Sequence, residues 1–178
     1  MPDTALIERF AAIVGEKNAL TAPEDIAAYL IEQRDLYHGR TPLVLRPGST
    51  EEVAAIMKLA TETRTPVVPQ GGNTGLVGGQ QPDESGAAII LSLGRMNRIR
   101  NLDTVGNLVT LEAGVILKTC RMRLKRQAAC FRFHLVRKVH ARSVAISAPT
   151  LAARQFLPMA ICASFALALK WCCRPVKS

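Results

Sequence analysis

The chain changes composition abruptly near residue 119, and this change limits how much of it can fold as one ordinary domain. Residues 1–119 carry 11 lysines and arginines, all 14 acidic residues and all 12 glycines, for a net charge of −3. Residues 120–178 carry 12 basic residues and all five cysteines, but no acid and no glycine. Because turns and helix starts draw on glycine and acidic residues, the sequence predicts a folded segment over 1–119 and an unpatterned tail over 120–178.

The tail gives the whole chain its net charge of +9 at pH 7. Such a charge favours a nucleic-acid or anionic membrane partner, so one alternative is a non-enzymatic basic protein that binds either through its tail. Basic runs such as 121–126 are more often a solvated face, and we expect no specific nucleic-acid partner. The apolar run 156–169 is shorter than the ~20 residues of a membrane-spanning helix. The cysteines lack disulfide or metal spacing, so we expect a location in the cytoplasm or at the inner membrane face.

The first segment has the pattern of an α+β protein, arranged as an α/β sandwich. Apolar residues from Leu6 to Val14 have helical spacing. Ser49 followed by Glu52 is a capping box and predicts the start of a second helix. Strands are predicted at 43–45, 67–68, 87–93, 97–101 and 108–112, with a further helix beginning at 115–118. The run 87–93 is apolar throughout, which is typical of a strand buried on both faces.

A glycine-rich loop follows the strand at 67–68. It contains Gly71, Gly72, Gly75, Gly78 and Gly79, with Asn73 and Thr74 among them. Glycine tolerates positive φ and leaves no Cβ to keep a ligand away. Successive backbone N–H groups in such a loop can converge on an anion. The loop therefore predicts a phosphate-bearing ligand that is held by backbone rather than by charged side chains.

Two common phosphate motifs do not fit this loop. A Walker-type loop requires Gly-Lys-Ser/Thr, whereas Gly79 is followed by Gln-Gln-Pro. A Rossmann fingerprint requires G-x-G-x-x-G and a long helix, whereas here the glycines are spaced by three and Pro82 blocks the helix. A mobile surface loop is the remaining alternative. Pro66 and Pro69 at the preceding strand favour a fixed, functional turn instead.

The string from Pro66 to Leu76 resembles the pyrophosphate loop of FAD-dependent oxidoreductases of the vanillyl-alcohol oxidase and p-cresol methylhydroxylase type. Residues 42–53, 91–97 and 109–115 are similar, in the same order, to motifs of the D-lactate and D-2-hydroxyglutarate dehydrogenase branch. The resemblance covers roughly residues 20–119. It implies that residues 1–119 are the first flavin-binding subdomain, the N-terminal half of a p-cresol methylhydroxylase-type FAD-binding domain.

The resemblance also implies a cofactor and an activity for the intact parent protein. FAD would be held around its pyrophosphate by Pro69, Gln70, Gly71, Gly72, Asn73, Thr74, Gly75, Leu76, Gly78 and Gly79. The parent would oxidise a D-2-hydroxy acid, lactate- or 2-hydroxyglutarate-like, to the 2-oxo acid by hydride transfer to FAD, and would pass the electrons to a separate acceptor. The family's substrate and proton-transfer residues lie further downstream. We therefore assign no catalytic or metal-binding residue, and interpret Tyr37, His38 and Arg40 as surface or packing residues. We expect this chain to hold half of an FAD site, to bind FAD weakly or not at all, and to have no activity.

The tail is compatible with the same family read in another frame. Codons permitted by residues 143–154 can spell Gly-Gly-Asn-Leu-Ser-Thr-Asn-Ala-Gly-Gly-Thr, and codons permitted by 158–163 can spell Tyr-Gly-Asn-Met-Arg. Codons permitted by residues 169–174 can spell Glu-Val-Val-Leu-Pro. Met159 and Trp171 have single codons, and both fit these strings. These strings are similar to the family's next motifs. We therefore expect that one base was lost, or two gained, near codons 118–121, and that residues 120–178 are an out-of-frame translation rather than a native domain.

Overall fold

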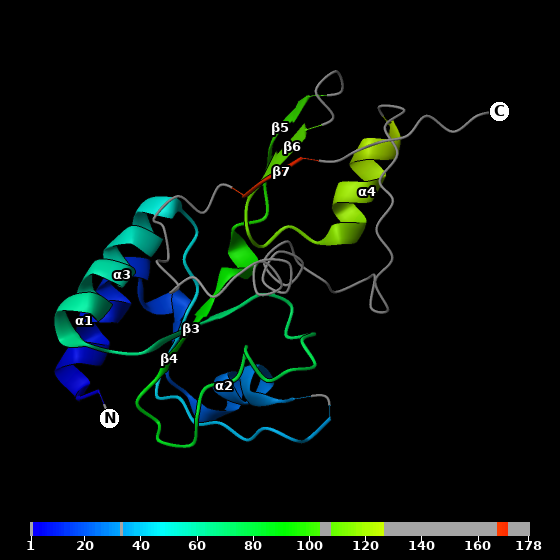
Figure 1. The fold of residues 1–178 in the computed structure, drawn as a ribbon. Coiled ribbons are helices and arrows are strands. Elements are labelled where there is room, and N and C mark those ends of the chain that lie inside the picture. The colour runs from blue at the N-terminus through cyan, green and yellow to red at the C-terminus, as the bar shows by residue number, and fades with distance from the viewer. Residues whose placement is uncertain (1, 33, 104–107, 127–166, 171–178) are drawn as a thin grey trace.

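The computed structural model of the chain describes residues 2–32, 34–103, 108–126 and 167–170. A four-stranded sheet with helices on both faces is joined to a second, three-stranded sheet (Figure 1). This architecture confirms the α+β class. The elements are, in chain order, α1 Thr4–Val14, a 3-10 turn Glu16–Asn18, β1 Ala19–Leu20, α2 Pro23–Leu30, β2 Val44–Leu45, α3 Thr50–Thr63, β3 Val67–Gln70, β4 Ile89–Ser92, a 3-10 turn Leu93–Arg95, β5 Ile99–Asp103, β6 Leu108–Leu111, α4 Leu117–Arg126 and β7 Leu167–Lys170.

The first sheet has the strand order β1-β2-β4-β3, in which β2, β4 and β3 are parallel and β1 is antiparallel to β2. Alternate residues of β4 face opposite sides of the sheet, as the pleat requires. Ile89 and Leu91 pack with α1 and α3, whereas Ile90 packs with α2. Both faces of β4 are therefore covered, which explains the continuous apolar run around it.

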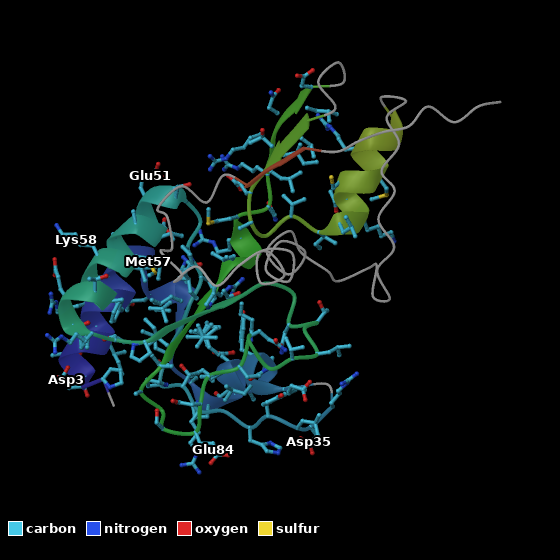
Figure 2. The ribbon with its side chains drawn as sticks, viewed as in Figure 1. Asp3, Asp35, Glu51, Met57, Lys58 and Glu84 are labelled. Atoms are coloured by element: carbon cyan, nitrogen blue, oxygen red, sulfur yellow. The ribbon has the colours of Figure 1, made fainter. Side chains whose placement is uncertain are left out.

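The capping box at Ser49 is present at the start of α3. The Ser49 hydroxyl accepts a hydrogen bond from the Glu52 backbone N–H at 3.2 Å. The Glu52 carboxylate accepts from the backbone N–H of Gly48 at 2.8 Å, one residue before the position that the motif usually satisfies. Figure 2 shows Asp3 and Glu51 at opposite ends of the α1–α3 pair, so the two helices, each labelled near its first turn, pack antiparallel.

The second sheet consists of β5, β6 and β7, all antiparallel. Its core contains Val109, Leu111, Val115 and Cys120, the last of these from α4. The predicted strands at 97–101 and 108–112 are thus confirmed within a residue or two. Residues 104–107, between them, lie outside the described residues.

The helix expected at 115–118 begins at Leu117 and continues to Arg126, beyond the predicted boundary at 119. β7 is the other described part of the tail, and the domain boundary stays a prediction. No helix in the described part of the chain is long and apolar enough to cross a membrane.

Candidate functional site

The glycine loop begins where β3 ends. Gln70 and Ser92 are paired in register, so the chain leaves β3 at the same edge of the sheet as it leaves β4. In parallel α/β sheets this carboxyl edge is where ligands usually bind. The loop then passes beside α2 before the chain enters β4 (Figure 1).

The Gln70 side chain does not face solvent. It is 1% exposed, and its Nε2 donates to the carbonyl oxygens of Tyr29 at 2.9 Å and Gln80 at 3.1 Å. Tyr29 lies in the last turn of α2, where carbonyl groups have no partner within the helix. Gln70 therefore fixes both ends of the loop against α2 and shapes the site from inside.

Asn73 also connects the loop to α2. Its Nδ2 donates to the carbonyl oxygen of Ile31 at 2.7 Å, and its backbone has a φ of +51°. Asparagine is one of the few residues other than glycine that adopts this left-handed conformation readily. Gln81 Nε2 donates to Asn73 Oδ1 at 3.2 Å and lies 3.5 Å from the Tyr29 oxygen. Three side-chain amides thus converge on the C-terminal end of α2.

The loop backbone has N–H donors without a hydrogen-bond acceptor among the described residues. Within the described part of the chain, none of the backbone N–H groups of residues 72–79 donates a hydrogen bond to protein. The loop is closed instead by Gln81 N–H, which donates to the Gly78 carbonyl oxygen at 2.9 Å. A run of free N–H groups is a site at which an anion can accept several hydrogen bonds.

Position 78 requires glycine because of its backbone conformation and its close neighbour. Its φ is +73°, and a Cβ there would lie 2.8 Å from the Tyr37 ring. Tyr37 is 46% exposed, and its ring packs over Gly78 of the loop. A pocket of about 370 Å³ lies beside this contact, lined by Leu36, Tyr37, His38, Gly78, Gln81, Pro82, Asp83 and Glu84.

The ten residues expected to bind a ligand all lie on β3 or in this loop. Gln70 is buried, Leu76 and Gly79 are exposed, and the others are partly buried, namely Pro69, Gly71, Gly72, Asn73, Thr74, Gly75 and Gly78. The Thr74 hydroxyl makes no hydrogen bond to any described residue. The sequence interpretation missed Gln81 and the end of α2, because no local pattern links positions 29–31 to the loop.

Charge is absent from the loop itself, since residues 70–81 include no lysine, arginine, aspartate or glutamate. A buried carboxylate, Glu32, follows Ile31 in sequence; it is 6% exposed and accepts from the backbone N–H groups of Arg34 and Leu36, each at 3.0 Å. No group of three or more potential metal ligands occurs among the described residues. An anion in the loop would therefore be held by backbone dipoles.

The family of the chain follows from comparison with known proteins. The profile of a family described as an FAD binding domain matches residues 41–139, which include the whole glycine loop. The chain belongs to this FAD-binding family. The match covers more than half of the chain. It runs past Arg126, the last residue of α4, to residue 139, and so beyond position 119, where the resemblance was expected to end.

The chain is similar in sequence to two named relatives. A mitochondrial protein of Schizosaccharomyces pombe, named as a candidate D-lactate dehydrogenase, is 40% identical over 121 residues, which are 63% of this chain and 22% of the relative. The mitochondrial D-2-hydroxyglutarate dehydrogenase of Arabidopsis thaliana is 39% identical over 118 residues, which are 65% of this chain and 20% of the relative. The chain thus spans about a fifth of the length of these relatives.

The fold agrees with that of a solved enzyme. The crystal structure of p-cresol methylhydroxylase with substrate bound matches with a TM-score of 0.58 at 18% identity, over 70% of this chain and 24% of that protein. The predicted fold, part of a p-cresol methylhydroxylase-type FAD-binding domain, is confirmed.

Proposed function

We propose that residues 69–79 of this FAD-binding chain hold the pyrophosphate of FAD, mainly through backbone N–H groups. The observation that carries this proposal is the run of unused N–H donors at 72–79 in a loop without charged side chains. Phosphate oxygens accept several hydrogen bonds at once, and convergent backbone donors suit them. The Thr74 hydroxyl is free to add a further contact, whereas Gln70 and Asn73 shape the loop.

The parent activity is proposed from the relatives. Both are named as dehydrogenases of D-2-hydroxy acids, lactate in one case and 2-hydroxyglutarate in the other. FAD, when bound, supplies an acceptor for the two electrons of such an oxidation. We propose that the intact parent oxidises a D-2-hydroxy acid to the 2-oxo acid and passes the electrons to a separate acceptor.

This chain itself would hold only half of the flavin site. It spans about a fifth of its relatives, and dinucleotide affinity depends on a complete, preformed site. We propose weak FAD binding and no oxidation of hydroxy acids by this chain.

Equilibrium dialysis of the full chain against FAD, ADP and riboflavin tests the loop assignment. FAD and ADP share the pyrophosphate, so both should bind with similar millimolar affinity, and riboflavin should not bind. Gly72→Asp should abolish FAD binding, because a negative charge among the N–H groups repels the pyrophosphate. Ala5→Asp adds the same charge on α1 and should have no effect. Equal binding of riboflavin and FAD, no binding at millimolar FAD, or full binding by Gly72→Asp would each contradict the proposal.

We also propose that residues 120–178 are translated out of frame. The support is their lack of glycine and acid together with the family motifs that the alternative frame can spell. Sequencing the coding DNA across codons 115–125 should reveal a lost or gained base. If the bases stand as translated and the other frame does not spell Gly-Gly-Asn-Leu-Ser-Thr-Asn-Ala-Gly-Gly, the tail is genuine. Salt-sensitive retention on DNA or anionic vesicles, lost on deletion of the tail, would then support the basic binding protein.

A further inference from the structure

We infer that Gln81 is a positioning residue of the glycine loop. Together with Gln70 and Asn73 it forms what we call the amide clamp, three side chains that fix the loop against the last turn of α2. The ligand-binding consequence of this inference rests on the proposed function, whereas the mechanical consequence does not.

The orientation of each amide in the clamp is determined by its partners. The carbonyl oxygens of Tyr29 and Ile31 can only accept hydrogen bonds, so the atoms facing them must be the amide nitrogens of the clamp. Asn73 Nδ2 faces Ile31 at 2.7 Å, which turns Asn73 Oδ1 toward Gln81. Gln81 Nε2 then donates to Asn73 Oδ1 at 3.2 Å. The clamp is a directed chain of donors that ends on α2.

The clamp lies where the loop needs restraint. Gln70 and Gln81 flank the loop, and Asn73 stands within it at a φ of +51°. Glycine-rich backbone loses more conformational entropy on ordering than other backbone. A clamp that already orders the loop spares a bound anion that cost, which is the general effect of preorganisation.

The surroundings of the Gln81 side chain indicate that its Nε2 donor, rather than its Oε1 acceptor, positions the loop. Its side chain is 9% exposed, and Oε1 is buried without a hydrogen-bond partner among the described residues. A buried unpaired acceptor costs stability, whereas an apolar side chain of the same shape would pack without that cost. Gln81→Met should therefore keep the global stability and lose only the restraint on the loop.

Native-state proteolysis of the full chain separates these two effects. Leu76 and Val77 are 43% and 82% exposed, and thermolysin cleaves before such residues. Cleavage requires the loop to open locally, so its rate reports the opening equilibrium. Cleavage products are identified by mass spectrometry, which separates the loop site from sites elsewhere in the chain.

Gln81→Met should raise the cleavage rate at 76–77 about tenfold, which is the factor expected for one or two lost hydrogen bonds. The melting temperature of this variant should stay within about 2 °C of the wild-type value. Asn73→Asp, which places an oxygen against the Ile31 carbonyl, should do the same. The control Ile56→Val lies in the core among α1 and α3 and should lower the melting temperature without raising cleavage at 76–77. Wild-type cleavage rates in both clamp variants would overturn the inference.

Millimolar ADP should slow cleavage of the wild-type loop, and should slow it less in Gln81→Met. If ADP has no effect on the wild type while both clamp variants still open the loop, the proposed pyrophosphate site fails and the clamp stands. If ADP protects the wild type and Gln81→Met equally, and both are cleaved at the same rate without ligand, the clamp fails and the pyrophosphate site stands.

Discussion

The side-chain amide of Asn73 donates to the carbonyl oxygen of Ile31 at 2.7 Å, across 42 positions of sequence. This bond makes the glycine loop depend on α2, a helix that packs on the opposite face of the sheet from α1 and α3. A carbonyl at the end of a helix has no partner within the helix, so the same bond satisfies α2 and places the loop. The glycine loop is therefore not an independent turn, and a substitution in α2 can change its shape.

Gly78 should not tolerate a side chain, whereas its neighbour Gly79 should. Gly78 has a φ of +73° and a Cβ there would meet the Tyr37 ring, while a Cβ on Gly79 would meet nothing within 4 Å. Gly78→Ala should lower the free energy of unfolding by about 1–3 kcal/mol, and Gly79→Ala by less than about 0.5 kcal/mol. Urea denaturation of the two variants measures both values, and equal losses would show that the Tyr37 contact does not form.

Arg95 should stabilise the turn before α3. Its Nη1 donates to the Arg46 carbonyl oxygen at 2.6 Å, and its guanidinium covers Gly48. Arg95→Ala should lower the free energy of unfolding by about 1 kcal/mol, the usual contribution of such a hydrogen bond. Arg98→Ala is the matched control, because no side-chain hydrogen bond of Arg98 is found among the described residues. If both variants unfold at the same urea concentration, the Arg95 bond contributes nothing.

The start of α3 should be sensitive to pH. A hydrogen bond from the backbone N–H of Glu51 and the Ser49 hydroxyl both lower the pKa of the Glu51 carboxyl below its ordinary value, and Arg100 adds a small effect in the same direction. A lowered folded-state pKa means that the ionised group stabilises the fold above the ordinary pKa, and that this contribution is lost as the pH falls through the lowered value.

An NMR titration of Glu51 measures that pKa directly. Ser49→Ala should raise it toward the ordinary value and should also lower stability by about 1 kcal/mol through loss of the helix cap. Ser85→Ala, in the segment before β4, should leave the titration of Glu51 unchanged. An ordinary pKa for Glu51 in the unsubstituted chain would contradict the hydrogen bonds to its carboxylate from its own backbone N–H and from Ser49.

The parts of the fold that the sequence predicts are those with local patterns. The capping box at Ser49 and the apolar run at 87–93 each correspond to an element, because helix starts and doubly buried strands leave signals within a few residues. β1 has only two residues and leaves no periodicity. α2 begins with proline at its first turn and acidic residues after it, signals that sequence reasoning could have used.

The glycine loop could be predicted from the sequence, but the hydrogen bonds that hold it against α2 could not. Gln70, Asn73 and Gln81 contact α2 from positions 41 to 52 residues away in sequence. Hydrogen bonds at such separations depend on which face of the sheet α2 covers, and the sequence pattern does not specify that. The packing of the Tyr37 ring on Gly78 likewise joins residues far apart in sequence, and no local sequence pattern specifies it.

The flavin content of a frame-restored protein tests the account most directly. A coding sequence corrected by one base at codons 118–121 should yield a longer protein that retains FAD through gel filtration, whereas the present chain should lose it. Gly72→Asp should remove FAD from the longer protein, and Ala5→Asp should not. Stoichiometric FAD in the present chain, or a soluble frame-restored protein without FAD, would contradict the claim that this chain carries the first half of a flavin site.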